Sequence, residues 1–143
     1  MSVDNSTVSK ASESWPWPDS LDALVAAPKH HALLLEDDRV RVLHTAIPAG
    51  DVVPLHTHCW GGFAYVQSWS HFIRRDERGS VLFDSREAGE PPAVPCAQWM
   101  PPLPPHTVEN LGPREISILV VELKIVELKI VELKNPASLA VPS

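Results

Sequence analysis

Cysteine is scarce in this chain of 143 residues, which contains only Cys59 and Cys96. Two cysteines give no disulfide framework, so the sequence favours a reducing compartment, and we expect a cytoplasmic protein. Basic residues are also few: 12 Lys and Arg stand against 18 Asp and Glu, giving a net charge of −6. No basic cluster extends beyond Arg74 and Arg75, which we expect on a solvated face. This balance argues against nucleic acid as a partner.

Long apolar runs are absent as well. No stretch approaches the roughly 20 apolar residues that a membrane-spanning helix needs. The first twenty residues lack a basic segment followed by an apolar one, so no signal peptide is predicted. We therefore expect no membrane partner.

Proline, in contrast, is abundant, with 15 residues that limit helix and punctuate short apolar segments. The pattern is typical of an all-β sandwich or barrel. A short helix is predicted over residues 21–27, capped by Asp19 or Ser20 and stopped by Pro28. Strands and a hairpin turn at 76–79 follow; the strands are expected at 39–47, 52–58, 63–75, 80–83, 97–100, 106–110 and 115–124. The predicted organisation is an N-terminal arm with the helix (1–32), a β-barrel (33–124) and an extension with a tail (125–143).

The extension contains a repeat with a period of five residues. Val121-Glu-Leu-Lys-Ile recurs from Val126 and, with a final Asn, from Val131. A strand alternates faces every two residues, so successive copies would turn their apolar residues to opposite faces. We interpret the repeat as a duplication that lengthened the last strand, and we assign it no catalytic role.

Two histidine motifs carry the chemistry. Side chains two apart on a strand point to the same face, so His56 and His58 present two imidazoles side by side. His106 can supply a third from a neighbouring strand, which predicts a metal site with room for water or substrate. The alternative is three ordinary, partly buried histidines. The remaining histidines are expected at the surface (His30, His31 and His71) or, for His44, in the core, at the surface or facing the substrate.

The two motifs resemble those of the cupin superfamily. Gly50, five residues and then His56-Thr-His58 resemble its first motif, and Pro105-His106, three residues and then Asn110 resemble its second. The resemblance covers roughly residues 33–124 and implies a double-stranded β-helix, or jelly-roll barrel, with a metal in its mouth. Family members commonly bind iron, manganese, nickel or zinc. Asn110 is expected to brace a turn or bulge.

One position departs from the family pattern. Many cupins have a glutamate ligand four residues after the second histidine, where this chain has Gly62. By strand parity Glu109 points away from His106 and is a poor substitute. The site therefore resembles the three-histidine set of the cysteine-type and β-diketone-type cupin dioxygenases. Glycine at this position is expected to leave space for substrate.

The resemblance implies an Fe(II)-dependent dioxygenase that binds O2 beside its substrate. Three neutral ligands leave the metal charge unopposed, which favours a small chelating anion as that substrate. Two alternatives stay open. One is a non-redox, metal-dependent isomerase or hydrolase using Zn or Ni, and the other is a non-catalytic binding module. Mn is a further possible metal for the site. We expect a homodimer, and we expect the substrate pocket to include Trp60, Gly62, Trp99 and His44.

Overall fold

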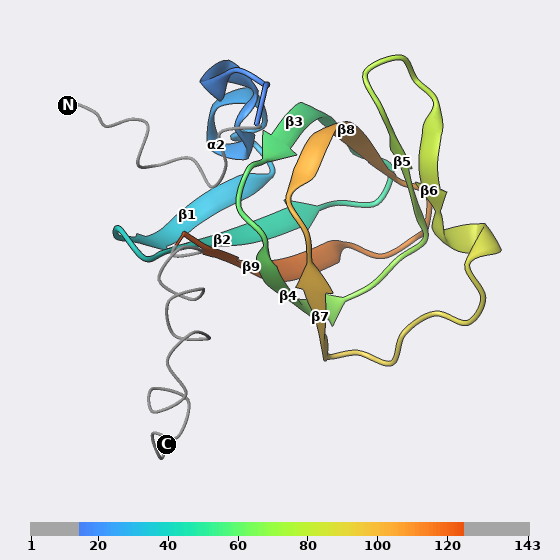
Figure 1. Ribbon diagram of the computed structural model, residues 1–143. Helices are drawn as coiled ribbons and strands as arrows, with labels where there is room; N and C mark the ends of the chain where they lie inside the picture. The colour runs from blue at the N-terminus through green and yellow to red at the C-terminus, as the bar shows by residue number, and fades with distance from the viewer. Residues whose placement is uncertain (1–14, 125–143) are drawn as a thin grey trace, which may run out of the picture.

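A computed structural model describes residues 15–124 of the chain. The polar segment 1–14 and the second and third copies of the repeat lie outside these residues. The described chain forms two antiparallel sheets with one short α-helix beside them (Figure 1). The strands are β1 (His31–Glu36), β2 (Val40–Ile47), β3 (Val52–His58), β4 (Gly62–Ser68), β5 (Phe72–Arg75), β6 (Val81–Asp84), β7 (Cys96–Met100), β8 (Leu103–Asn110) and β9 (Ile116–Leu123).

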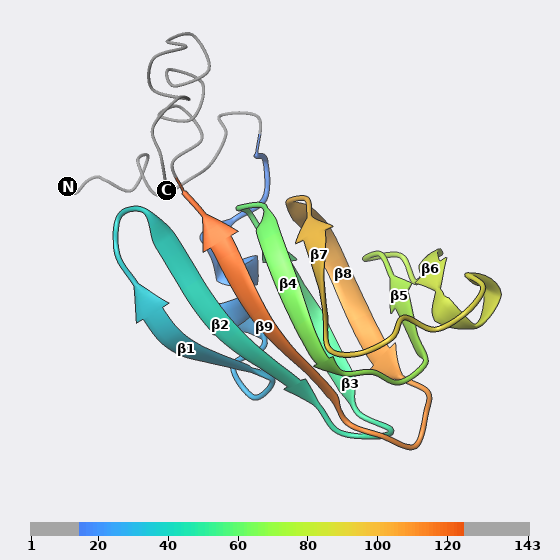
Figure 2. The ribbon, with the colours of Figure 1, turned by 90° about the horizontal axis from the view of Figure 1, so that it is seen from below.

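In each sheet, strands that are distant in the sequence lie side by side. Within the described residues, one sheet has the order β1-β2-β9-β4-β7 and the other the order β3-β8-β5-β6 (Figure 2). Strand β2 is the clearest amphipathic element, because Arg41, Leu43, Thr45 and Ile47 are buried while the residues between them are half-buried. The predicted fold class, an all-β double-stranded β-helix (jelly-roll barrel) with a short N-terminal helix, is confirmed.

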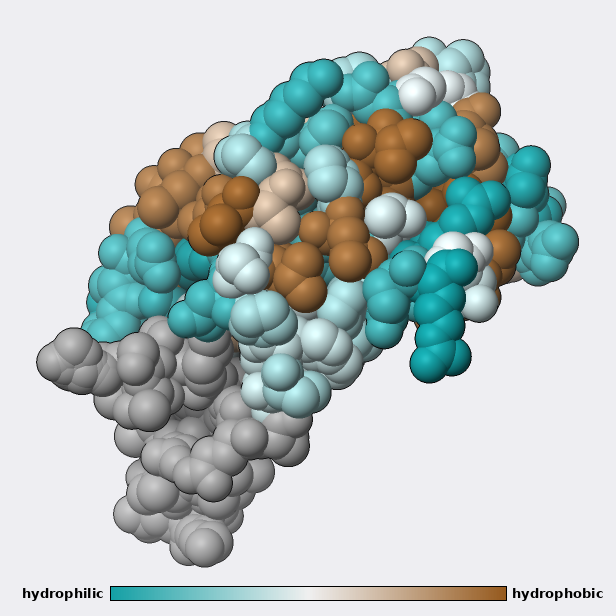
Figure 3. Space-filling model, turned by 90° about the horizontal axis from the view of Figure 1, so that it is seen from above, coloured by the Kyte–Doolittle hydropathy of each residue, from teal (hydrophilic) through white to brown (hydrophobic). Residues whose placement is uncertain are grey.

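Apolar side chains from both sheets meet between them. Ile47 of β2 and Ile116 of β9 pack with Val53 of the opposite sheet, and Leu43 packs with Val120. On the outer face that Figure 3 shows, hydrophobic patches are interrupted by hydrophilic side chains. Burial between the sheets is therefore the main source of stability.

The long strand predicted over residues 63–75 is wrong, because the structure has two strands there. Strand β4 belongs to the five-stranded sheet and β5 to the four-stranded one, so the chain changes sheets between them. Ser70 is 1% exposed at this crossing, and Gly112 packs directly against it. No glycine or proline marks the crossing in the sequence, so no turn residue separates the two strands.

The N-terminal helix is shorter than predicted and begins later. A 3-10 turn, η1 (Asp19–Leu21), leads into α2 (Ala23–Ala26), and the cap is Asp22, whose carboxylate accepts from the Leu24 amide at 3.0 Å. Asp22 also forms a parallel bridge with Thr57, so the start of the helix lies beside the free edge of β3. No helix among the described residues is long and apolar enough to cross a membrane.

Asn110 ties the two sheets together. Its side-chain amide donates to the carbonyl oxygens of Ile47 at 2.9 Å and Arg114 at 2.7 Å. Its oxygen accepts from the Gly112 amide at 3.0 Å. The residue is 1% exposed, so these bonds satisfy backbone groups that water does not reach. The structure thus gives Asn110 the bracing role.

Candidate metal centre

Strands β3 and β8 bring the three motif histidines together. His56 is directly opposite His106 in the register, and their ring centroids are 4.3 Å apart. His58, two residues along the same face of β3, lies 5.1 Å from His56 and 5.9 Å from His106. All three residues are at least 96% buried. Strand alternation and pairing therefore place the three rings in one cluster.

A fourth histidine joins the cluster from the opposite sheet. The ring of His31, at the start of β1, lies 4.8 Å from that of His56 and 5.4 Å from that of His58. These three residues each offer a ligand atom within 4.8 Å of the other two, so they could hold a divalent metal ion. The surface positions predicted for His30 and His31 are wrong, because both are 5% exposed, whereas His71 is half-buried.

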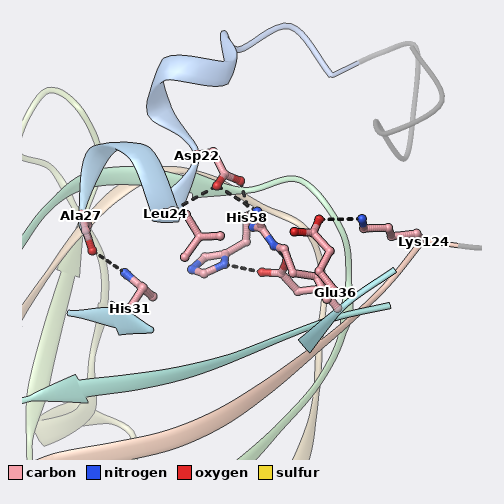
Figure 4. A network of polar contacts seen from close by, with 9 residues as sticks. Asp22, Leu24, Ala27, His31, Glu36, His58 and Lys124 are labelled. Atoms are coloured by element: carbon pink, nitrogen blue, oxygen red, sulfur yellow. Dashed lines mark hydrogen bonds and ion pairs between the residues drawn. The ribbon is translucent and has the colours of Figure 1, made fainter. Parts of the chain in front are cut away.

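Each ring is held by its Nδ1 atom. The Nδ1–H of His56 donates to the Pro54 carbonyl and that of His106 to the Pro104 carbonyl, both at 2.7 Å. The ring of His31 donates to the Ala27 carbonyl at 2.9 Å, and the ring of His58 to Glu122 at 2.7 Å (Figure 4). All four partners are acceptors, so each Nδ1 carries the hydrogen. The Nε2 atoms are thereby left with lone pairs suited to a metal.

Burial keeps the rings of His31, His56 and His106 uncharged. Burial, together with the adjacent rings of His106 and His58, lowers the pKa of His56 to about 2. Burial likewise lowers the pKa of His106 to about 3 and that of His31 to about 4. Neutral imidazoles are the form that binds metal, so the donor set fits a divalent transition metal without prior loss of protons.

A buried charged network supports His58. Glu122 is fully buried, and its other oxygen accepts from the Nε of Arg41 at 2.7 Å. Arg41 donates on to both oxygens of Asp22, at 3.0 and 2.9 Å, and its guanidinium lies 5.0 Å from the Trp60 ring centroid. A carboxylate behind a ligating histidine fixes the ring and raises its basicity.

The sequence analysis missed Glu122, which lies in the first copy of the repeat. Its Cα is paired with that of Gly62, the position where many cupins have their glutamate. A carboxylate therefore does reach this level of the barrel, from the neighbouring strand, but it contacts the ring of His58. No local motif could have indicated this, because Glu122 is 64 residues away from His58 in the chain.

Gly62 is needed for strand packing and does not line the substrate space. A Cβ atom there would collide with the Val121 carbonyl oxygen and approach the Glu122 Cα to 3.2 Å. The expectation that this glycine leaves room for substrate is therefore corrected: it leaves room for β9.

We predict that Gly62→Ala lowers the free energy of unfolding by about 2–3 kcal/mol, because β4 and β9 must separate. Gly50→Ala is the comparison, since Gly50 has open space around it and only its φ of +81° opposes alanine, at about 1 kcal/mol. Urea unfolding of both variants measures the difference. Equal losses would contradict the packing argument.

The four histidines line a cavity of about 360 Å³ between the sheets. Its walls are mainly apolar, and Ile47, Val53, Val66, Phe72, Val108 and Ile118 are among the residues that form them. Of the predicted pocket residues, Trp99 lines this cavity. Trp60 is buried beside Arg41 and Lys124, and His44 lies on the outer face of β2, 2.9 Å from the Ser117 hydroxyl. The substrate-facing positions expected for Trp60 and His44 are thus corrected.

No protein-family model and no curated protein matches the chain. Among solved structures, a cupin domain from Bordetella pertussis is 17% identical, with a TM-score of 0.49, and the match covers 65% of this chain and 90% of that one. A cupin from Methanocaldococcus jannaschii with a double-stranded β-helix fold is 13% identical, with a TM-score of 0.46, over 66% and 81%. A cupin-like protein from Thermotoga maritima is 14% identical, with a TM-score of 0.43, over 66% and 68%. The chain is similar in fold to these cupin-domain proteins.

Proposed function

We propose that the chain is a metal-dependent enzyme, and specifically an Fe(II)-dependent dioxygenase of a small chelating anion. One observation carries the proposal: four histidine rings, each with its Nδ1 hydrogen-bonded and its Nε2 available, line one apolar cavity. The metal ligands would be His31, His56, His58 and His106. This set adds His31 to the three histidines that the motifs indicate.

The chemistry of the donor set favours an anionic substrate. Imidazole ligands are neutral, so the ligand set itself cancels none of the ion's divalent charge and favours an anionic substrate. The carboxylate nearest to the rings, Glu122, is already shared between His58 and Arg41. Enolates, thiolates and 2-hydroxy acids are small anions that can chelate such a centre.

The protein's own residues would hold the substrate and keep the site dry. Fe(II) bound at the rings would supply the redox chemistry with O2 that amino-acid side chains lack. The hydrogen bonds at Nδ1 fix the orientation of each ring before substrate binds. The apolar walls, which include Phe72 and Val108, would exclude water and strengthen electrostatic contacts in the cavity.

O2 consumption tests the proposal. The full chain is reconstituted with Fe(II) under anaerobic conditions, mixed with acetylacetone, cysteine or lactate, and followed with an oxygen electrode. We expect iron-dependent uptake with at least one of these compounds and none with the Zn(II)-loaded chain. Uptake that is equal with and without iron would contradict the proposal. Turnover by the Zn(II) or Ni(II) form alone would favour a non-redox isomerase or hydrolase.

A further inference from the structure

Arg74 brings a positive charge to the cavity of the four histidines. Its side chain lines the cavity from β5, and its guanidinium carbon lies 5.8 Å from the centroid of the Phe72 ring. The Nε atom is buried and has no hydrogen-bond partner. Burial lowers the pKa of Arg74, but a guanidinium stays protonated at neutral pH. The sequence analysis expected a solvated face here, and the structure corrects that.

The charge of Arg74 has no counterion in the part of the chain that the structure describes. No carboxylate between residues 15 and 124 forms an ion pair with it. The next residue, Arg75, shows the ordinary arrangement: it points to the other face of β5 and pairs with Glu109 at 3.4 Å. Arg74 is half-buried, and its buried Nε–H has no acceptor, so the side chain offers a donor and a charge that an anionic ligand can meet.

The charges buried around the cavity do not balance once the metal is bound. Arg41 is offset by one of its two partners, Asp22 and Glu122, which leaves one negative charge. A divalent ion and Arg74 together bring three positive charges. The cavity therefore lacks two negative charges, which is the charge of a dianion.

The register places Arg74 close to a proposed metal ligand. Arg74 is paired with Val108 of β8, and His106 lies two residues further along the same face. Diagonal neighbours of this kind have Cα atoms roughly 7–8 Å apart. A guanidinium on β5 and a metal at His106 would thus be within reach of the two ends of one small molecule.

We propose that the cavity binds a small dicarboxylate, with one carboxylate at the metal and the other paired with the Arg74 guanidinium. The proposal deepens the proposed function and rests on its metal centre. A carboxylate fits better than a phosphate, because the guanidinium fork offers two parallel donors that match its two oxygens. Few other donors line the cavity for a third oxygen, and Thr45 and Gln98 are the main ones.

Matched pairs of ligands test this inference without measuring turnover. The Zn(II)-loaded full chain is titrated by calorimetry with malonate against propionate, succinate against butyrate, and glutarate against valerate. We expect at least one dicarboxylate to bind ten- to a hundred-fold more tightly than its monocarboxylate partner. Arg74→Met removes this preference, Arg74→Lys keeps part of it, and Arg75→Met leaves it unchanged. Elemental analysis gives the zinc content of every variant.

The outcomes separate this inference from the proposed function. A wild-type chain that holds no Zn(II) overturns the metal centre and this inference with it. A wild-type chain that holds Zn(II) but prefers no dicarboxylate overturns the role of Arg74 alone. An Arg74→Met variant that has full zinc content and still prefers dicarboxylates also overturns the role of Arg74.

Discussion

Replacing His56 with alanine is expected to weaken the binding of a divalent metal at least about a hundred-fold. His56 is the central ring of the cluster, since the rings of His31, His58 and His106 all lie within 5.1 Å of it. Its loss removes one nitrogen donor and opens the middle of the site. Competition of the purified chain with a chromogenic chelator for Zn(II) measures the affinity, and elemental analysis measures the stoichiometry.

The controls for this prediction come from the chain itself. His44→Ala removes a half-buried histidine on the outer face of β2, so its metal affinity is expected to equal that of the wild type. His31→Ala and His106→Ala distinguish the possible ligand sets. Both variants should bind metal weakly if four rings coordinate, whereas an unchanged His31→Ala would return the site to the three motif histidines. Equal affinity of His56→Ala and His44→Ala would rule out a metal centre at this cluster.

Glu122→Gln is expected to cost about 3–5 kcal/mol of the free energy of unfolding. Its two carboxylate oxygens accept from Arg41 and from His58, and the side chain is fully buried. Glutamine has one acceptor oxygen, so its NH2 group must face the N–H donor of either Arg41 or His58. The buried guanidinium of Arg41 would then keep only Asp22 as a charged partner. Urea unfolding of the metal-free chain measures the loss.

The same substitution should reach the metal centre. Without the carboxylate the His58 ring loses the partner that orients it, and metal affinity is expected to fall ten- to a hundred-fold. Glu115→Gln is the control, because Glu115 is exposed just before β9, and we expect a change within about 0.5 kcal/mol. A Glu122→Gln variant as stable as Glu115→Gln would show that the buried network contributes nothing to the fold.

The sequence by itself indicated the fold class and three of the four clustered histidines, His56, His58 and His106. Alternation on a strand depends only on residue spacing, so His56 and His58 had to share a face wherever β3 lay. Proline-rich turns and short apolar segments likewise limit the chain to strands. The change of sheet after Ser68 could not be predicted in this way, because spacing along the chain does not indicate which sheet β4 and β5 each join.

Tertiary structure decided everything that depends on strand pairing. His31 enters the cluster from the opposite sheet, Glu122 reaches His58 from β9, and Arg74 enters the cavity from β5. Each of these contacts joins residues far apart in the chain, and its existence depends on the order of the strands and on their register. A shift of one residue in register would turn these side chains to the other face of the sheet. No local pattern in the sequence specifies the strand order or the register.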